Sequence, residues 1–229
     1  MSDKVKVTTS KKAFRSSPVR NYRVGSRKLY ITAFDSENSY DPNGVAVEGL
    51  IEVNLTLSNE ITSFLADDNL SYITLTGPTT GTGTIRVTDM PIEALQYLAN
   101  VEVTNNGTIY GSDVELPHCA FKYEEQVSIS GQSGKSIDCT VIFDATISIS
   151  NFIAKANDGK SIADVTLNLT INPVTYMDLQ GVERSVTMFR TNSERHKATY
   201  AKFTKGIQFP SWELLHEIET TEPPMEDVL

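Results

Sequence analysis

The chain has 229 residues, 39% of them hydrophobic, and a formal net charge of −9 at pH 7. This is enough apolar material for one large β domain or two small ones, and no apolar run approaches the ~20 residues that span a bilayer. No apolar signal-peptide core follows the basic N-terminus, so we expect the protein to be made and folded in the cytosol, without a membrane partner.

Charge is distributed unevenly along the chain. Residues 1–28 hold nine Lys/Arg and one acid, whereas the segment from Glu213 to Leu229 holds six acids and no base. These ends fit self-association through opposite charges, although solvated, disordered ends explain the composition equally well. We therefore predict a basic arm over residues 1–21, a β domain over 22–210 and an acidic tail over 211–229.

Strand patterns dominate the body. Leu29, Ile31 and Phe34 begin it, and the segment from Asp35 to Gly44 has the composition of a loop. Residues 51–57 then alternate between apolar and polar side chains, which predicts a strand with one buried face.

The stretch from Ser58 to Val101 contains most of the turn and loop signals. It predicts a short strand, a turn at 66–69, a strand at 71–76, a loop of Gly, Pro and Thr at 77–83, and a strand at 84–87.

A short helix is predicted after that strand. Pro91 suits a first helical turn, and Ile92, Leu95 and Leu98 then form one apolar stripe. We expect these three residues to pack on the β body, where the helix would cover a sheet edge or plug one end of a sandwich.

Further strands follow downstream. Asn106-Gly107 predicts a hairpin turn after Val101 and Val103. Alternating patterns predict strands over 119–129, 137–149 and 165–171, each with an apolar and a polar face; Ile142 is the exception to the alternation. Cys119 and Cys139 sit at apolar phase in these strands, which predicts buried free thiols rather than a disulfide framework.

A second short helix is predicted near the end of the body. Asn192 and Ser193 are possible helix caps, and Tyr200 and Phe203 would form its apolar face.

The order of these segments resembles the major tail tube proteins of long, non-contractile-tailed phages of Gram-positive hosts. The resemblance covers roughly Tyr22 to Pro210. It rests on a Phe-led turn with two aspartates, a Thr-Leu-Thr-Gly segment, a Gly-Thr-Ile strand, a Pro-x-x-Ala-Leu helix, the opening strand 24–31 and the closing segment 186–207.

The resemblance implies a mainly β fold, a tail-tube-type sandwich or barrel with one or two short flanking helices. It also implies hexameric rings stacked into a hollow virion tail tube, assembled in the host cytoplasm, that conducts double-stranded DNA from the capsid to the cell. The implied partners are other copies of the chain, the tape measure and terminator proteins, and DNA that passes without specific binding.

The lumen prediction follows from the strand faces. The polar face of the predicted strands is opposite an apolar face that must be core, and the body is acidic. We therefore expect the wall of the channel to contain Glu124, Asp138, Thr140, Asp144 and Thr146.

Catalytic and metal sites are not predicted. His118, His196 and His216 are scattered, Gly81-Thr82-Gly83 is a weak phosphate loop, and the segment 131–134 is a hairpin turn rather than a nucleophile elbow. We expect neither an enzyme nor a cofactor.

Two other function classes remain open. A β-sandwich adhesin for carbohydrate would need aromatic side chains clustered on loops, but the single Trp212 lies in the predicted tail. The other is a tube subunit of a secretion or contractile injection machine, which sequence alone separates poorly from a phage tail tube subunit. Electron microscopy of purified protein would distinguish tubes, rings and monomers.

Overall fold

The computed structural model of the chain describes residues 21–36, 39–66, 69–98, 101–110, 118–129, 135–153 and 164–216. The predicted N-terminal arm up to residue 20, the acidic residues after 216, and the turn at 130–134 lie outside these ranges.

The described residues form strands and three short helices. The strands are β1 (Asn21–Ser36), β2 (Ser39–Tyr40), β3 (Val45–Val47), β4 (Leu50–Ala66), β5 (Asn69–Val87), β6 (Val101–Thr104), β7 (Gly107–Tyr110), β8 (His118–Ile129), β9 (Lys135–Ile153), β10 (Asp164–Ile171), β11 (Val174–Met177), β12 (Glu183–Val186) and β13 (Met188–Asn192). The helices are α1 (Ile92–Leu95), α2 (Lys197–Lys205) and α3 (Trp212–Leu215).

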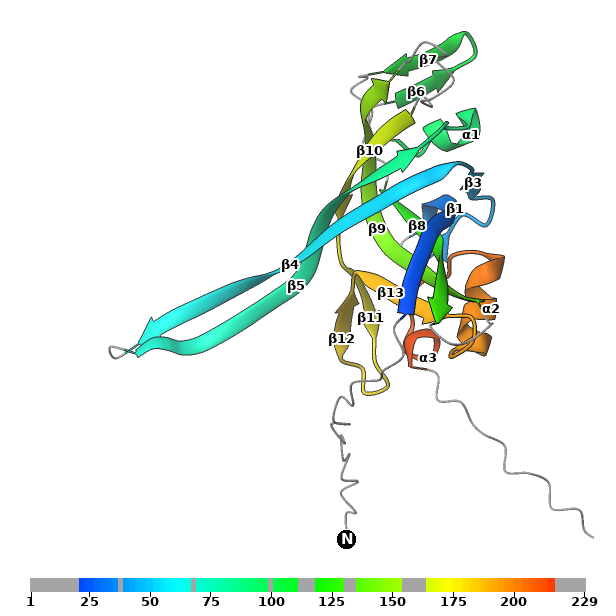
Figure 1. Ribbon diagram of the computed structural model, residues 1–229. Helices are drawn as coiled ribbons and strands as arrows, with labels where there is room; N and C mark the ends of the chain where they lie inside the picture. The colour runs from blue at the N-terminus through cyan, green and yellow to red at the C-terminus, as the bar shows by residue number, and fades with distance from the viewer. Residues whose placement is uncertain are drawn as a thin grey trace, which may run out of the picture.

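One antiparallel sheet dominates the molecule (Figure 1). Its strand order is β2-β1-β8-β9-β10-β5-β4, with β3 paired to β1 and β13 paired to β9. Two small hairpins, β6–β7 and β11–β12, extend from it. The prediction of a mainly β fold with short helices is confirmed; within the described residues, the sheet does not close into a barrel.

Each face of the sheet packs against its own helix. The α1 face carries the larger core, which includes Ile142, Ala145 and Ile147 from β9 together with Leu95 of α1. The α2 face carries a smaller core, in which Val141 and Phe143 of β9 meet Phe203 of α2 and Leu214 of α3. The center of the sheet is therefore buried on both sides.

A bulge in β9 exchanges these faces. Phe121 pairs with Ile142 but Cys119 pairs with Ala145, so one extra residue stands in β9 between these two pairs. A one-residue shift moves every following side chain to the other face. Cys139, Val141 and Phe143 thus lie on the α2 face, whereas Ala145, Ile147 and Ile149 lie on the α1 face, which explains why Ile142 broke the sequence alternation.

The predicted loop at 77–83 is wrong, because β5 runs through it. Gly81 and Gly83 pair with Leu57 and Leu55 of β4, and a Cβ on either glycine would come within 2.8 Å of those leucine side chains. The glycines therefore leave room for leucines on the neighbouring strand. The β4–β5 register shifts between Asn59 and Ile61, opposite Pro78, where the missing N–H of proline costs no regular ladder bond.

The short helices differ from their predicted extents. Leu95 and Leu98 are 5% and 1% exposed, but Ile92 is 63% exposed, because α1 makes only one turn and its first residue points away from the core. The predicted tail boundary at 211 is also too early. Ser211 caps α3 by accepting a hydrogen bond from the Leu214 N–H, and Leu214 is buried.

The predicted turn and thiols are confirmed, whereas the predicted cap of α2 at Asn192 or Ser193 is wrong, because the helix begins after His196. The Asn106-Gly107 turn joins β6 and β7, and both cysteines are buried and free. Asn192 accepts backbone N–H bonds from Glu194 and Arg195 just before α2. The helices of the described residues are all too short to cross a membrane.

Candidate functional site

An open, uncharged face is the most distinctive surface of the sheet. Beyond the bulge, the α2 face is no longer covered by the helices, and Thr, Ser and Asn side chains line up across four strands. Thr56, Thr82, Thr170 and Thr146 form one row through β4, β5, β10 and β9, and Asn54, Thr84, Asn168 and Ser148 form the next. We call these eight residues the polar wall.

The polar wall is accessible along its length. Five of its members are exposed and the other three are half-buried. A shallow hollow of about 440 Å³ lies over β4, β5 and β10 and is lined by six of the eight residues. The backs of the same strands carry Ile85, Leu167 and Leu169 into the core of the α1 face, so the wall is held on a packed support.

Paired charges border the wall at both ends. Arg86 binds Asp164 through its guanidinium and approaches Glu52 to 3.4 Å, and the hydrogen bond with Asp164 raises the pKa of Arg86 above its ordinary value. At the other end, Nδ1 of His118 lies 2.8 Å from Oδ1 of Asp144. The wall between these borders contains hydroxyl and amide groups and no charged side chain.

The five predicted lumen residues do not share one face. Glu124 pairs with Cys139, and Glu125 pairs with Asp138, so Glu124 and Asp138 point to opposite sides of the sheet. Thr140 follows Asp138 on the α1 face and is 2% exposed, Asp144 is 8% exposed beside His118, and Thr146 alone belongs to the polar wall. The structure therefore does not bring the five predicted residues together on one surface.

Glu124 fastens α2 to the sheet. Its carboxylate accepts a 3.2 Å hydrogen bond from the Tyr200 hydroxyl and lies 3.4 Å from Lys28 Nζ. Burial, followed by the nearby Glu124 charge, raises the pKa of Tyr200 to about 12. Lys122 donates to the backbone carbonyl of Phe203 in α2, and burial lowers the pKa of this lysine. These side chains join the sheet to α2.

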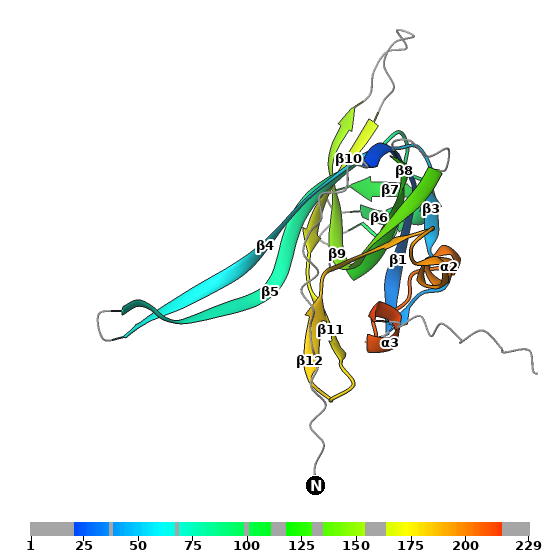
Figure 2. The same ribbon diagram turned by 60° about the horizontal axis from the view of Figure 1, so that its bottom comes forward.

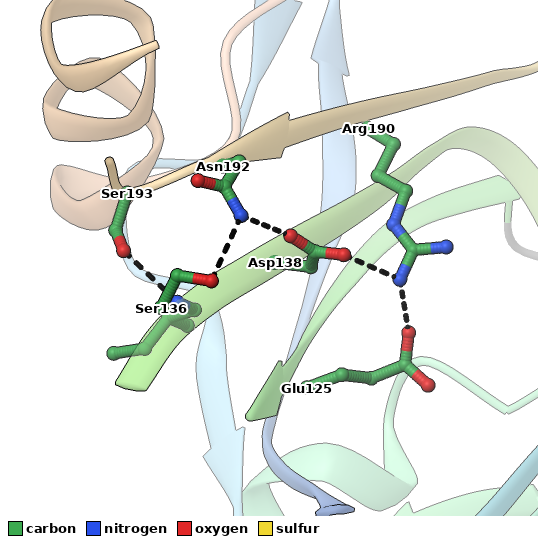
Figure 3. Close-up of polar contacts among 7 residues, drawn as sticks. Glu125, Ser136, Asp138, Arg190, Asn192 and Ser193 are labelled. Carbon is green, nitrogen blue, oxygen red and sulfur yellow. Dashed lines mark hydrogen bonds and ion pairs between the residues drawn. The ribbon is translucent and has the colours of Figure 1, made fainter. Parts of the chain in front are cut away.

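Asp138 belongs to a network that attaches β13 (Figure 3). Arg190 Nη2 lies 2.7 Å from Glu125 and 2.8 Å from Asp138, and Asn192 donates to the same Asp138 carboxylate. Ser193 then accepts a hydrogen bond from the Ile137 N–H. The network fixes the register of β13 on β9, and both side chains that bind Asp138 directly come from β13.

Sequence reasoning found five of the eight residues of the polar wall. The alternation in β4, β9 and β10 placed Asn54, Thr56, Thr146, Ser148 and Asn168 on polar faces, whereas Thr82 was hidden by the expected loop at 77–83. The sequence did not reveal that β5 lies between β4 and β10 and pairs with both, which aligns the polar residues of the three strands. Among the described residues, no group of three His, Cys, Asp or Glu side chains could hold a metal ion.

Comparison with protein-family models finds no match, and neither does comparison with curated proteins. Two solved structures are similar in fold. One is a chain of the PVC sheath–tube complex of an extracellular contractile injection system in the extended state, with a TM-score of 0.32 and 10% identity over 74% of this chain and 92% of that one. The other is a type six secretion system protein, with a TM-score of 0.25 and 10% identity over 71% and 91%. Both TM-scores lie below 0.5, so neither likeness carries weight in assigning a function.

Proposed function

We propose that the chain is the repeating subunit of a phage tail tube of the long, non-contractile type. In this proposal, hexameric rings stack into a tube whose lumen conducts double-stranded DNA, and the role is structural rather than catalytic. The sequence resemblance over Tyr22 to Pro210 supports the proposal, and one structural observation carries it: the β4–β5 ribbon.

The β4–β5 ribbon extends far from the body (Figures 1 and 2). Pairing of β4 with β5 continues from Leu50 to Ala66, but pairing of β10 with β5 ends at Gly81. Beyond that point the ribbon has two strands, which are marginally stable alone in water. Ile61 on this part is 65% exposed.

Such a ribbon needs a second surface. Its sequence between Ile61 and Leu75 also contains Phe64, Leu70 and Ile73. A neighbouring copy of the same chain would supply that surface. A head-to-tail contact of this kind, repeated from copy to copy, builds rings or filaments. Burying the ribbon against a neighbour also protects its strand edges from non-specific pairing.

The polar wall is suited to the lumen. Lys and Arg contacts to phosphate hold DNA, whereas hydroxyl and amide groups without charge give a passing duplex no such attachment. In the proposed tube, Thr56, Thr82 and Thr170 face the channel, and the acidic side chains of Asp164 and Asp144 at the borders also offer phosphate no attachment. The tape measure and terminator proteins are the further partners of a subunit in the virion.

Electron microscopy of the purified protein tests the assembly. We expect rings or stacked tubes at high concentration, and we expect the Ile61→Asp variant to remain monomeric with an unchanged thermal midpoint, because Ile61 lies outside the packed body. Monomers of the unaltered protein at every concentration would overturn the proposed function. Tubes formed by the Ile61→Asp variant would instead show that the ribbon contact is not needed for assembly.

An ejection assay tests the lumen. Thr82→Lys combined with Thr170→Lys should leave tube length normal and slow DNA ejection, most strongly at low salt, because phosphate contacts are screened over about 10 Å at 0.1 M salt. Asn105→Lys, at the exposed β6–β7 turn, is the matched control. Unchanged ejection by the double variant at every salt concentration would mean that the wall lies outside the channel.

A further inference from the structure

A groove with aromatic walls lies between the β11–β12 hairpin and α3. It has a volume of about 420 Å³, and Tyr176, Met177, Phe209 and Trp212 contribute to its lining. Met177 is 63% exposed. The Trp212 ring stacks on His216 at 3.8 Å between centroids, which holds the indole against α3. The groove therefore offers exposed apolar area on a fixed frame.

The hairpin side of the groove is held rigidly. The Asp178 carboxylate accepts N–H bonds from Gln180 and Val182 and lies 3.1 Å from Nε of Arg184. These bonds, that from the Val182 N–H first, lower the pKa of Asp178. A turn fixed in this way presents Met177 without the entropy cost that a flexible loop would incur on binding.

The charge of the groove is acidic. Glu183 and Glu213 both line it and are exposed, and none of the described residues that line it is basic. A partner segment that combines an aromatic side chain with Lys or Arg on either side would match both the apolar and the charged parts of the groove.

The chain contains one such segment outside the described residues. Residues 1–20 hold six Lys/Arg and one acid, and Phe14 is the only aromatic among them, with Lys12 and Arg15 beside it. The basic charges and the aromatic ring of this segment match the acidic charges and the aromatic walls of the groove.

The start of β1 lies away from the groove of its own copy. Phe34, near the end of β1, lies 6.4 Å from the groove residue Phe209, and β1 ends near α3 (Figure 2). At the other end of β1, Asn21 pairs with Ile129, ten residues of β8 from the partner of Ala33, which is roughly 33 Å at the rise of a strand. Phe14 precedes Asn21 by seven residues, which span at most ~25 Å. A neighbouring copy offers the same groove without a fully stretched segment, so we take the partner to be another copy.

We propose that this groove binds the N-terminal segment of a neighbouring copy, with Phe14 in contact with the aromatic walls and Lys12 and Arg15 beside Glu183 and Glu213. The inference rests on the proposed function, since it names one contact between copies in the assembly. This contact joins the groove to the N-terminal segment, so it is separate from the contact made by the β4–β5 ribbon.

Cysteine cross-linking of the full chain tests the contact. Phe14→Cys combined with Thr175→Cys, an exposed residue that lines the groove, is treated with a short bis-maleimide; the native Cys119 and Cys139 are buried. We expect a ladder of covalent multimers on a denaturing gel. Phe14→Cys combined with Asn105→Cys, at the opposite hairpin, should give none.

Charge reversal sharpens the test. Glu183→Lys with Glu213→Lys in the double-cysteine chain should lower the multimer yield about fivefold, the effect of ~1 kcal/mol across exposed charges. Adding Lys12→Glu and Arg15→Glu should restore it.

The outcomes separate this inference from the proposed function. Tubes in the microscope without a ladder, or with a cross-link confined to single chains, would overturn the inference and leave the tube intact. If no tubes form, the proposed function fails, and the cross-linking yield at high concentration still decides whether the segment binds a neighbour.

Discussion

The two halves of the α2 face contrast sharply although β9 runs through both. Before the bulge, Val141 and Phe143 are fully buried beneath α2 and α3. After it, Thr146 and Ser148 continue into the uncovered polar wall. The strand, the sheet and the support behind it are shared, so the difference lies in what covers the face. One extra residue in β9 turns its apolar side chains toward the α1 face and leaves polar side chains on the α2 face.

The largest expected effect lies in the covered half. Phe143→Ala should lower the free energy of unfolding by about 3–5 kcal/mol, because the side chain is fully buried and its removal leaves a cavity. Thr170→Ala on the polar wall should stay within about 0.5 kcal/mol. Urea unfolding of both variants measures the contrast, and equal losses would mean that the wall is covered within the monomer.

The α1 face offers a matched pair beside one short helix. Leu95→Ala should cost about 2–5 kcal/mol, since Leu95 is buried in the core behind the polar wall. Ile92→Ala, three residues earlier and exposed, should cost under about 0.5 kcal/mol. Thermal midpoints of the monomeric proteins report the difference; a large loss for Ile92→Ala would show that this side chain has a partner in the body.

The glycines of β5 test how tightly the wall is supported. Gly83→Ala would place a Cβ 2.5 Å from the Asn54 carbonyl and 2.8 Å from a Leu55 methyl, so β4 must shift. We expect a loss of about 1–3 kcal/mol. Thr84→Ala, on the adjacent wall position, serves as control in the same denaturant titration. A neutral Gly83→Ala would imply that β4 moves freely on β5.

Alkaline pH should weaken the protein by a smaller amount, with contributions from Cys139 in the covered half and from Cys119 in the α1-face core, since burial raises the pKa of both thiols. Burial raises the pKa of Cys139 from 9.0 to about 11, so the unfolded thiol loses its proton at a lower pH than the folded one. Stability present below pH 9 should therefore decline as pH rises toward 11, by at most ~1.4 kcal/mol per pH unit for this thiol. The lowered pKa of Lys122 acts in the opposite sense.

Cys139→Ala isolates this thiol contribution. The variant should show a shallower decline of the urea midpoint between pH 9 and 10.5 than the unaltered protein, whatever its stability at neutral pH. Parallel declines would indicate that the thiol ionises equally in the folded and unfolded states.

The sequence predicted the strands better than it predicted their faces. Period-two alternation located β8, β9 and β10 because each has one side in a core. It could not reveal the bulge between Ile142 and Ala145, because both faces of β9 carry apolar side chains there and each face packs into a core. Asp138 and Asp144 were grouped as one face for this reason, whereas Glu124 was grouped with Asp138 because the sequence does not give the β8–β9 register.

Local composition misled the prediction elsewhere. Gly77 to Gly83 has turn residues, but long-range pairing with Leu55 and Leu57 overrides that preference. The Ser211-Trp212 segment carried a capping signal for α3 that charge-based reasoning about the tail passed over. The polar wall needs four strands in register, and no single segment encodes it.

The pairing of β1 with β8 has a consequence for synthesis on the ribosome. Asn21 pairs with Ile129, so β1 must wait while about 100 further residues are translated, several seconds at typical rates of ~5–20 residues per second. The ribbon of β4 and β5 is local and can close within that interval. A nascent chain thus displays its intermolecular arm before the body that anchors it is complete, and polysome-bound subunits are exposed to premature association unless a chaperone or a low local concentration delays it.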